Sequence, residues 1–379
     1  MPENILYDIA VIGGGLAGLT LSIQAASKGY KVIMFEKEQY PFHKVCGEYI
    51  SLESWDFLVG LGVPLAEWNV PVIKKFQTSD VAGRLYNFEL PLGGFGISRY
   101  KLDNYLYNLA LQKGVVVLTE TKVLDARLIN DRFNVTTANA IFQATVVAGT
   151  FGKRSNLDLK WGRSFAEKKH GKLNNYIGIK YHVRFNNDAD TIALHNFQNG
   201  YCGISKVEDG NSCLCYLTTA QNLTQNGNSI RKMEEEVLYK NPLLKNIFRE
   251  AHFLYDKPLT ISQVSFSAKS QVENNVMMLG DAAGMITPLC GNGMSVAMHG
   301  SKLAFNSIDR YLQQKLSRTE MEKEYIDAWH THFAKRLWVG RIVQQLFGGK
   351  RSTALFFKTM QALPMLARQV IRSTHGQPF

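Results

Sequence analysis

The sequence predicts an α/β fold in which a Rossmann-type domain is interrupted by an antiparallel β-sheet domain and followed by a helical C-terminal segment. A glycine-rich turn between an apolar strand and a helix opens the chain, and a second strand–glycine–helix arrangement returns near residue 280. Between them lie runs of alternating apolar and polar residues, which are typical of antiparallel strands. A length of 379 residues fits about two such domains.

The first unit of the predicted parallel sheet is a strand–helix–strand segment. Residues Ile9–Ile12 form a short apolar run, Leu16–Lys28 has helical periodicity and stops at a glycine, and Lys31–Phe35 is the next apolar run. A βαβ unit needs about thirty residues, and this segment supplies them.

The turn of this unit carries the spacing G-x-G-x-x-G at Gly13, Gly15 and Gly18. In the dinucleotide-binding fingerprint the first glycine permits a tight turn, the second lets a pyrophosphate approach the backbone, and the third allows close helix–strand packing. Glu36, at the end of the second strand, is placed to accept hydrogen bonds from a ribose 2′-hydroxyl. Because no second motif of this kind follows a strand, one tightly held FAD is favoured over a nicotinamide cofactor. The other predicted contacts of this site are Leu16, Ala17 and Lys37.

The remaining elements follow from periodicity and turn residues. Further helices are expected at residues 98–111, 229–239, 242–251 and 293–312. Further strands are expected at residues 115–118, 123–129, 132–137, 140–142, 146–148, 176–185, 191–197, 213–219, 260–267 and 276–279. We predict three parts of the chain: a discontinuous FAD-binding domain (1–75, 98–170 and 262–315), an antiparallel substrate domain (76–97 and 171–261) and a basic helical C-terminal segment (316–379).

A second motif follows the predicted strand at residues 276–279. It reads Gly280-Asp281-Ala282-Ala283-Gly284 and continues through Pro288 to Gly291, Asn292 and Gly293, where a long helix begins. With this motif the chain resembles the FAD-dependent oxidoreductases of the p-hydroxybenzoate hydroxylase fold, and within that fold the geranylgeranyl-reductase-like branch.

The resemblance implies roles for the residues of this motif. Asp281 is expected to contact the ribityl or pyrophosphate part of FAD, and Pro288 to form one wall of the flavin pocket. Residues Gly291 to Met294 are expected to present backbone N–H groups to the flavin ring. A helix N-terminus at this place stabilises the negative charge of reduced flavin.

Three more segments extend the resemblance along the chain. Residues 41–48 are similar to the P-x-x-K-x-C-G segment of the reductase-like branch, whose cysteine and glycine lie against the flavin. Arg99 opens an R-x-x-L-D-x-x-L helix, in which the arginine reaches the cofactor; an Arg99–Asp103 ion pair within the helix is the alternative. Val123 matches the position whose backbone meets the adenine. The cofactor contacts implied by these and the flanking motifs are Lys44, Cys46, Gly47, Arg99, Val123, Gly149 and Gly280.

Departures from the resembled patterns narrow the function. The G-A-D-G-x-x-S pattern of hydroxylases has Phe151 in place of its aspartate, which puts direct docking of NADPH in doubt. The aromatic Y-x-W-x-F-P segment of the reductases retains only its tyrosine, Tyr201, so a geranylgeranyl chain as substrate is not supported. No W-x-W-x-I-P segment occurs, which argues against a flavin halogenase.

Four residues are candidates for chemistry or substrate contact. Cys46 and Glu48 are candidate catalytic groups beside the flavin, with a buried filler and a paired carboxylate as the alternatives. Tyr201 and His195, on strands of the second domain, are candidates to line the substrate pocket, with a core histidine as the alternative for His195. Few charges occur in residues 196–205, so we expect an apolar or aromatic substrate.

Charge and cysteine content address location and partners. The formal charge is +11, and the basic excess is concentrated after residue 328, where no Asp or Glu occurs. We consider two interpretations: a packed helical cap with its basic side in water, or peripheral contact with an anionic membrane; nucleic acid is not an expected partner. Five cysteines without a CxxC pair, and no leader-like start, predict a cytoplasmic protein with reduced thiols and no metal site.

Two functions remain open at this stage. The first is an FAD-dependent enzyme acting on an apolar or aromatic molecule by C=C reduction or monooxygenation, with NAD(P)H or a reduced carrier as external reductant. The second is a membrane-associated flavin electron-transfer protein without substrate chemistry of its own. The sequence does not decide the substrate, the electron donor or the oligomeric state.

Overall fold

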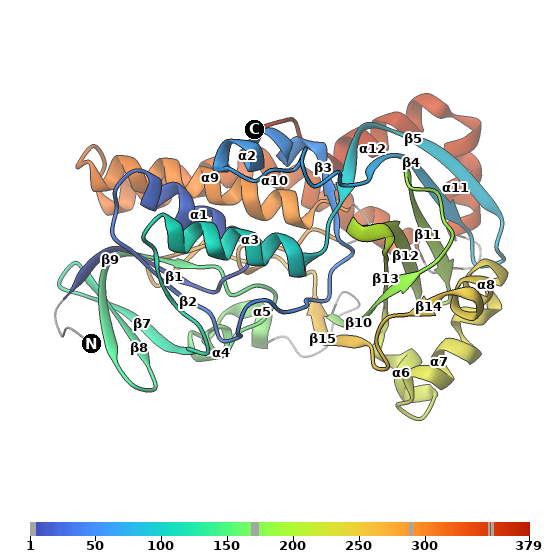
Figure 1. Ribbon diagram of the computed structural model, residues 1–379, viewed down its shortest axis with the longest axis horizontal. Coiled ribbons are helices and arrows are strands. Elements are labelled where there is room, and N and C mark those ends of the chain that lie inside the picture. The colour runs from blue at the N-terminus through green and yellow to red at the C-terminus, as the bar shows by residue number, and fades with distance from the viewer. Residues whose placement is uncertain (1–4, 168–173, 288–290, 348, 350–351) are drawn as a thin grey trace.

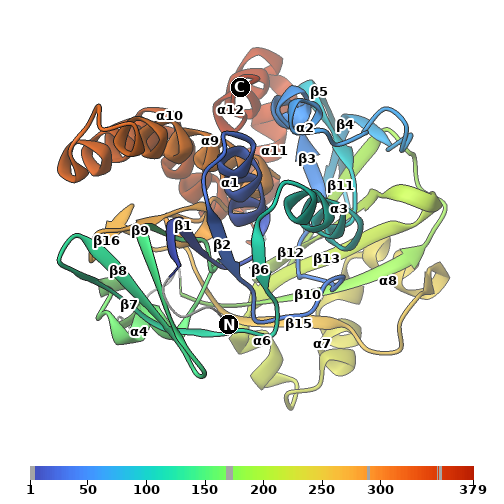
Figure 2. The ribbon, with the colours of Figure 1, turned by 60° about the vertical axis from the view of Figure 1, so that its left-hand side comes forward.

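The computed structural model describes residues 5–167, 174–287, 291–347, 349 and 352–379, and contains two β-sheets and a C-terminal group of helices (Figures 1 and 2). This architecture confirms the predicted α/β class with a helical C-terminal segment.

The first sheet has a parallel core in the order β17-β9-β1-β2-β6. Its central strand β1 pairs with β2 on one side and β9 on the other, and all three are almost wholly buried near their carboxyl ends. One expectation was wrong here: the strands predicted at 140–142 and 146–148 are a single strand, β9, because its first half pairs antiparallel with β8 while its second half joins the parallel core. The bounds are β1 (Leu6–Ile12), β2 (Val32–Phe35), β6 (Val116–Leu118), β7 (Val123–Ile129), β8 (Arg132–Thr137), β9 (Ile141–Gly149), β16 (Val272–Glu273) and β17 (Val276–Met278).

Helices α1 (Leu16–Ser27), α3 (Arg99–Gln112) and α9 (Gly293–Leu312) lie side by side along this sheet (Figures 1 and 2). Helix α1 packs against both of the others. The hydroxyls of Thr20 and Ser301 are 2.7 Å apart, which joins α1 to α9 through their buried sides. The bounds of α9 agree with the predicted helix at both ends.

The second sheet has the order β14-β10-β13-β12-β11-β4-β5-β3, with β15 added beside β10. It is antiparallel except for the parallel pair of β11 and β4. Strand β3 and the start of β4 belong to this sheet, although the predicted boundaries place residues 49–75 in the FAD-binding domain; the boundaries themselves stay a prediction. The bounds are β3 (Tyr49–Ser51), β4 (Val72–Ser79), β5 (Leu85–Gly96), β10 (Asn174–Arg184), β11 (Thr191–Phe197), β12 (Gly200–Lys206), β13 (Ser212–Thr219), β14 (His252–Phe253) and β15 (Leu259–Ser265).

The two faces of this sheet meet different neighbours because side chains alternate along each strand. One face packs against α7 and α8 through a cluster that includes Ile179, Phe197 and Met233. The other face carries a smaller apolar cluster that reaches Met285, in the loop before α9. The short helices are α2 (Trp55–Leu61), α4 (Asn156–Lys160), α5 (Ser164–Glu167), α6 (Ala220–Gln225), α7 (Ile230–Glu236) and α8 (Pro242–Glu250).

The C-terminal segment consists of α10 (Arg318–Leu346), α11 (Ser352–Ala362) and α12 (Pro364–Thr374). Helix α10 packs on α9 through buried residues that include Tyr325 and Phe333. Helix α11 places Phe357 against Tyr86 of β5. Of the helices in the described residues, none has both the length and the apolar character to cross a membrane.

Candidate cofactor and substrate site

The three glycines of the first motif have three different surroundings. Gly13 has φ +111°, a value that favours glycine. A Cβ on Gly18 would lie 2.1 Å from the carbonyl oxygen of Gly13, so this position admits nothing larger. A Cβ on Gly15 would have only Arg99 within 4 Å, at 3.9 Å, so the backbone here is open to a ligand. These surroundings are those that the fingerprint requires.

Two side chains that sequence reasoning missed hold the glycine turn in place. The hydroxyl of Thr150, just past β9, donates to the carbonyls of Ile12 and Gly13. The hydroxyl of Tyr40 donates to the carbonyl of Gly14 and its ring stacks on Tyr107 at 4.4 Å. Each contact joins distant parts of the chain, so no spacing in the sequence could indicate it.

Glu36 lies where the prediction placed it, at the end of β2. One of its oxygens accepts a hydrogen bond from the backbone N–H of Gly14 at 2.8 Å, and the other from that of Glu38 at 3.1 Å. Lys37 points to solvent beside Glu38. The carbonyl of Val123 accepts a hydrogen bond from Asn156 at 3.3 Å. The contacts of these residues with a ribose or an adenine stay predictions.

Arg99 is both a helical ion-pair partner and a neighbour of the phosphate-binding turn. Its guanidinium donates two hydrogen bonds of 2.7 Å to Asp103, which also accepts one of 3.1 Å from Lys44. The two carboxylate oxygens of Asp103 hold the guanidinium of Arg99 beside Gly15. The ion pair is therefore compatible with the cofactor role, because it aims the positive charge at the open turn.

The loop of the second motif is held by its backbone carbonyls. Lys269 donates to the carbonyl of Asp281 at 2.7 Å, Arg163 to that of Ala282 at 2.9 Å, and Gln271 to that of Ala283 at 3.1 Å. Burial lowers the pKa of Lys269 to about 8, against the opposing effect of Asp281. The carboxylate of Asp281 itself makes no hydrogen bond to another described residue, which leaves it available to a ligand.

The N-terminus of α9 has the features of a ligand site. The side-chain amide of Asn292 donates to the carbonyl of Thr374 at 2.6 Å, while its buried oxygen has no partner among the described residues. Gly291 has φ +65° and leaves no room for a Cβ beside the ring of Tyr49, whereas Gly293 is open. Met294 is buried in the core, and Pro288 lies outside the described residues.

The two glycine motifs lie at the same edge of the parallel sheet. Gly13, Gly149 and Gly280 each follow or end a strand at its carboxyl end. A Cβ on Gly280 would lie 3.3 Å from Ala17 in α1 and 3.4 Å from Ala297 in α9. The N-terminal turns of both helices therefore converge here, and the open glycines and the unpartnered Asn292 oxygen fit one extended dinucleotide such as FAD.

The segment from Lys44 to Glu48 is fastened to the flavin-facing side of the second sheet. The ammonium group of Lys180 donates to the carbonyl of Lys44 at 3.1 Å, and the thiol of Cys213 lies 3.2 Å from the carbonyl of Cys46. Cys46 is half-buried and, like the other described cysteines, a free thiol. The predicted contacts of Cys46 and Gly47 with a flavin stay predictions.

Glu48 is the centre of a buried charge cluster. Its carboxylate accepts hydrogen bonds from Lys180 and from the backbone N–H of Arg99 at 2.8 Å, and lies 2.5 Å from His182. Burial raises the pKa of Glu48, but Lys180 and His182 together lower it to about 2. Such a group stays ionised at neutral pH, so the geometry favours a structural over a proton-donating role. Glu48, His182 and Cys213 together are residue types that can bind a metal ion, but the carboxylate of Glu48 is already paired with Lys180.

The two predicted substrate residues lie on opposite faces of the second sheet. Tyr201 belongs to the apolar cluster with Leu194, Leu217 and Met285. His195 lies on the other face, in register with Cys202 of the helix-covered cluster, and its Nδ1 is 3.1 Å from the hydroxyl of Ser79. Burial lowers the pKa of His195 to about 4. The geometry supports the core alternative for His195, whereas the substrate contact of Tyr201, which is buried in its cluster, stays a prediction.

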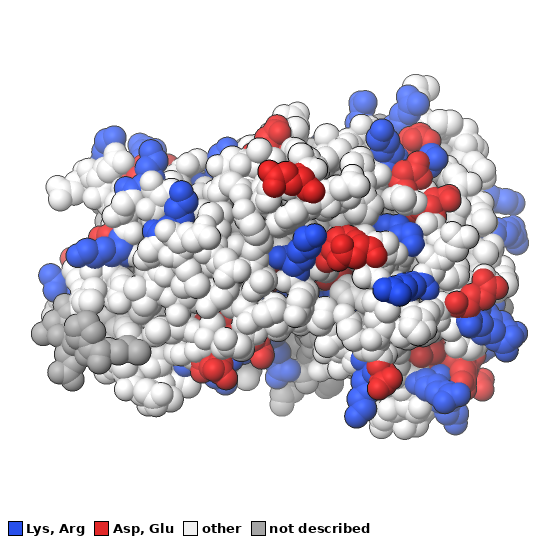
Figure 3. All heavy atoms as spheres, viewed as in Figure 1, with Lys and Arg blue, Asp and Glu red and all other residues white. Residues whose placement is uncertain are grey.

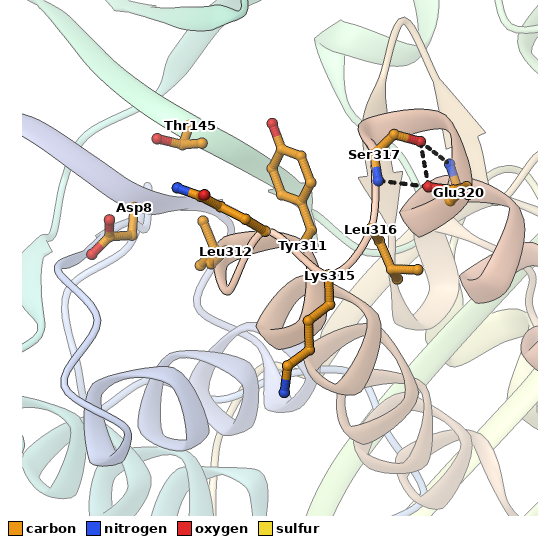
Figure 4. Close-up of a pocket in the computed structure, with 9 residues that line it drawn as sticks. Asp8, Thr145, Tyr311, Leu312, Lys315, Leu316, Ser317 and Glu320 are labelled. Carbon is orange, nitrogen blue, oxygen red and sulfur yellow. Dashed lines mark hydrogen bonds between the residues drawn. The ribbon is translucent and has the colours of Figure 1, made fainter.

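A surface hollow of about 600 Å³ lies elsewhere, beside the turn between α9 and α10 (Figure 4). Asp8 and Thr145 line it from the first halves of β1 and β9, and the capping box of Ser317 and Glu320 lines it from α10. Ligands of open α/β sheets bind at the carboxyl ends of the strands, so this hollow is not the cofactor site.

Comparisons with known proteins agree with this site. Residues 8–44 match the FAD binding domain family, and residues 204–347 match the squalene epoxidase family. A digeranylgeranylglycerophospholipid reductase of Methanocaldococcus jannaschii is 24% identical over 86% of this chain and 83% of its own length. Conditioned medium factor receptor 1 of Dictyostelium discoideum is 23% identical over 87% of this chain and 69% of its own length.

Solved structures share the whole architecture. A flavin-dependent brominase variant superposes with a TM-score of 0.79, at 18% identity over 98% of this chain and 94% of its own. A geranylgeranyl bacteriochlorophyll reductase-like protein from Thermoplasma acidophilum gives 0.75, at 18% identity over 97% and 95%. The predicted FAD-dependent oxidoreductase fold and its likeness to geranylgeranyl reductases are confirmed. Halogenases share the fold as well, so the fold alone does not separate reductases from halogenases, and the expectation drawn from the missing W-x-W-x-I-P segment stays a prediction.

Proposed function

We propose that the protein is an FAD-dependent oxidoreductase that reduces a carbon–carbon double bond of an apolar organic substrate. The observation that carries the proposal is the apolar cluster in which Leu194, Tyr201 and Leu217 meet Met285, because this cluster connects the second sheet to the loop of the flavin-side motif. Ligand pockets are lined mainly by apolar and aromatic side chains, so we propose that the substrate binds against this cluster. The similarity of residues 41–48 to the reductase-like branch favours reduction over oxygen insertion.

Bound FAD would supply the two-electron chemistry. Reduction of the double bond adds a hydride to one carbon and a proton to the other, and NAD(P)H or a reduced carrier returns the two electrons. The chain's own residues would hold the cofactor: the turn at Gly15 with Arg99 would receive the diphosphate, and the N-terminus of α9 would receive the flavin ring. The apolar cluster excludes water from the substrate.

The relatives support an apolar substrate. The reductase of Methanocaldococcus jannaschii is named for a phospholipid with isoprenoid chains, and another relative is a menaquinone reductase of Mycolicibacterium smegmatis. An enzyme of the cytoplasm would meet such a substrate at a bilayer, through peripheral contact by its C-terminal segment. The named comparisons do not support the electron-transfer alternative.

The test is anaerobic reoxidation of the reduced holoprotein by alkenes. The purified protein is reduced with dithionite and mixed in separate reactions with an aromatic alkene, stilbene, and with a polyprenyl alcohol, and flavin absorbance and product mass are followed. We expect reoxidation with one saturated bond formed per flavin. In a parallel reaction under air, oxygen uptake with an oxygenated product would instead show monooxygenation. Without oxygen, reoxidation by quinones with no loss of alkene would show electron transfer.

A pair of variants connects this reaction to the apolar cluster. Tyr201→Leu should slow the reoxidation by the alkene at least tenfold, because it alters the flavin-facing side of the sheet. Tyr239→Leu, which alters the opposite side, is the control and should leave the rate unchanged. Equal effects of the two substitutions would place the substrate elsewhere.

A further inference from the structure

The turn between α11 and α12 exposes a continuous apolar stretch to solvent. Leu363 is 53%, Met365 86% and Leu366 40% exposed, and Pro364 between them is exposed as well. Leu355, one helix earlier, is 68% exposed. We call residues Leu363–Leu366 the apolar tip. Runs of exposed apolar residues are uncommon on soluble proteins and mark interaction sites.

The tip does not belong to the packed side of its helices. Helix α11 turns Thr353, Phe357 and Met360 toward the body, and Phe357 contacts the ring of Tyr86 at 5.3 Å. The spacing of these residues is that of one helix face, so Leu355 and Lys358 lie on the outer side. The helices are therefore anchored through their inner sides, while the turn between them stays in water.

Cations surround the tip, and acidic residues are missing from this part of the sequence. Lys358, Arg368 and Arg372 are exposed within the two helices that the tip connects. From residue 328 to the C-terminus the sequence contains no Asp or Glu. At the upper right of Figure 3, Lys and Arg side chains lie beside uncharged atoms and beside Asp and Glu side chains, which belong to other parts of the chain because residues 328–379 contain none. Among the described cations of this segment, Arg336 is buried, in an ion pair with Glu53.

We propose that the apolar tip and these three cations dock the protein on an anionic lipid bilayer. An apolar wedge enters the boundary between headgroups and acyl chains, and lysine and arginine beside it bind anionic headgroups. The charge pattern selects the bilayer over a second copy of the chain, because two such surfaces would repel each other. The docking deepens the peripheral contact that the proposed function names, but it does not depend on the reaction proposed there.

The docking surface is continuous with the substrate cluster. Phe347, at the end of α10, packs against Tyr201 with ring centroids 6.1 Å apart, and also against Phe357 of α11 at 5.3 Å. A bilayer bound at the tip would thus lie next to the segment that covers the apolar cluster, which suits a substrate dissolved in the membrane.

The experiment is sedimentation of the FAD-loaded full chain with vesicles of phosphatidylcholine alone or mixed with phosphatidylglycerol. We expect binding to the mixed vesicles only, weakened by salt. We expect binding to weaken about a hundredfold in the triple variant Lys358→Gln/Arg368→Gln/Arg372→Gln, because each cation that is removed weakens it about fivefold. Leu363→Ser/Met365→Ser/Leu366→Ser should weaken it at least about tenfold. Ile141→Ser/Leu159→Ser, at sites 64% and 60% exposed in the first domain, is the control and should bind as the wild type does.

Other outcomes overturn the proposal. Absence of binding to the mixed vesicles excludes the bilayer, and full binding by the serine variant of the tip excludes insertion. A wild-type dimer that the same variant converts to monomer, or tip-dependent binding of an acidic acyl carrier protein without vesicles, assigns the tip to a protein partner. Flavin content and thermal unfolding of each variant verify the fold, and anaerobic alkene reduction in detergent tests the proposed function separately.

Discussion

The phosphate end and the flavin end of the cofactor site are held by different interactions. At the phosphate end, Gly13 and Gly18 pack backbone against backbone within one strand–turn–helix unit. At the flavin end, Lys269 fixes the loop of the second motif from twelve residues before it, and Lys180 fixes the segment that ends at Glu48 from a distant part of the chain. The first end depends on shape, whereas the second depends on buried charges, so the two should fail under different substitutions.

The largest expected effect is at the charge cluster. Glu48→Gln leaves the ammonium group of Lys180 buried without its counter-charge, and loss of one partner of a buried pair costs about 3–5 kcal/mol. Urea unfolding of the apoprotein measures this loss. The double variant Glu48→Gln/Lys180→Met should recover part of the stability, because it removes both charges.

An exposed pair supplies the control for that substitution. Lys75 and Asp190 are 2.9 Å apart but have side chains 54% and 40% exposed. Asp190→Asn should leave the unfolding midpoint unchanged, because solvent screens such pairs. If Glu48→Gln were equally neutral, the cluster would not hold the flavin end, and the contrast between the two ends would be lost.

The substitution Gly18→Ala tests the close backbone packing at the phosphate end of the cofactor site. The added Cβ would meet the carbonyl oxygen of Gly13 at 2.1 Å, and a backbone atom cannot move aside as a side chain can. We expect a loss of about 3 kcal/mol, at the upper end of the cost of overpacking. Gly60→Ala in α2, where nothing lies within 4 Å of the new Cβ, is the control and should be neutral or stabilising. Equal stabilities of the two variants would show that the turn relaxes.

This contrast also explains what could be predicted from the sequence. The glycine spacing at Gly13–Gly18, the second motif and the bounds of α9 follow from local patterns, and the structure agrees with them. Arg163, Lys269 and Tyr40 were missed, because each donates to a carbonyl more than twenty residues away and no local pattern marks it. His195 shows a different difficulty: alternation along β11 identifies two faces but does not say which one meets the flavin.

The pH dependence of stability distinguishes a buried group that is neutral in the folded protein, His195, from one that is ionised, Glu48. His195 has a folded pKa of about 4, below its ordinary value of about 6.5, because burial disfavours its charged form. The unfolded chain therefore binds a proton that the folded chain does not, and stability falls as the pH drops from about 6.5 to about 4, by up to about 3 kcal/mol. Glu48, whose folded pKa is about 2, loses its contribution only between about pH 4.5 and 2.

Urea unfolding between pH 7 and 5 measures the share of His195. His195→Asn should flatten the decline of stability in this range, whereas substitution of the exposed His330 should not. An unchanged slope in His195→Asn would mean that other buried groups, such as His299, whose pKa burial lowers to about 3, account for the decline.

The smallest expected effect on stability separates folding from cofactor binding at the phosphate end. Gly15→Ala adds a Cβ whose nearest neighbour, the guanidinium of Arg99, is 3.9 Å away, and Gly15 has φ −82°, which alanine adopts without strain. The apoprotein should therefore unfold at the wild-type urea concentration. The methyl group nevertheless occupies the space through which a diphosphate reaches the backbone, so the Kd for FAD, measured by quenching of flavin fluorescence, should rise at least about tenfold, or about 1.4 kcal/mol. An unchanged Kd would place the diphosphate elsewhere, even if Gly18→Ala destabilises the turn as expected. Because Gly15 and Gly18 are three residues apart in the same turn, their different outcomes would show that one glycine is required by packing and the other by the ligand.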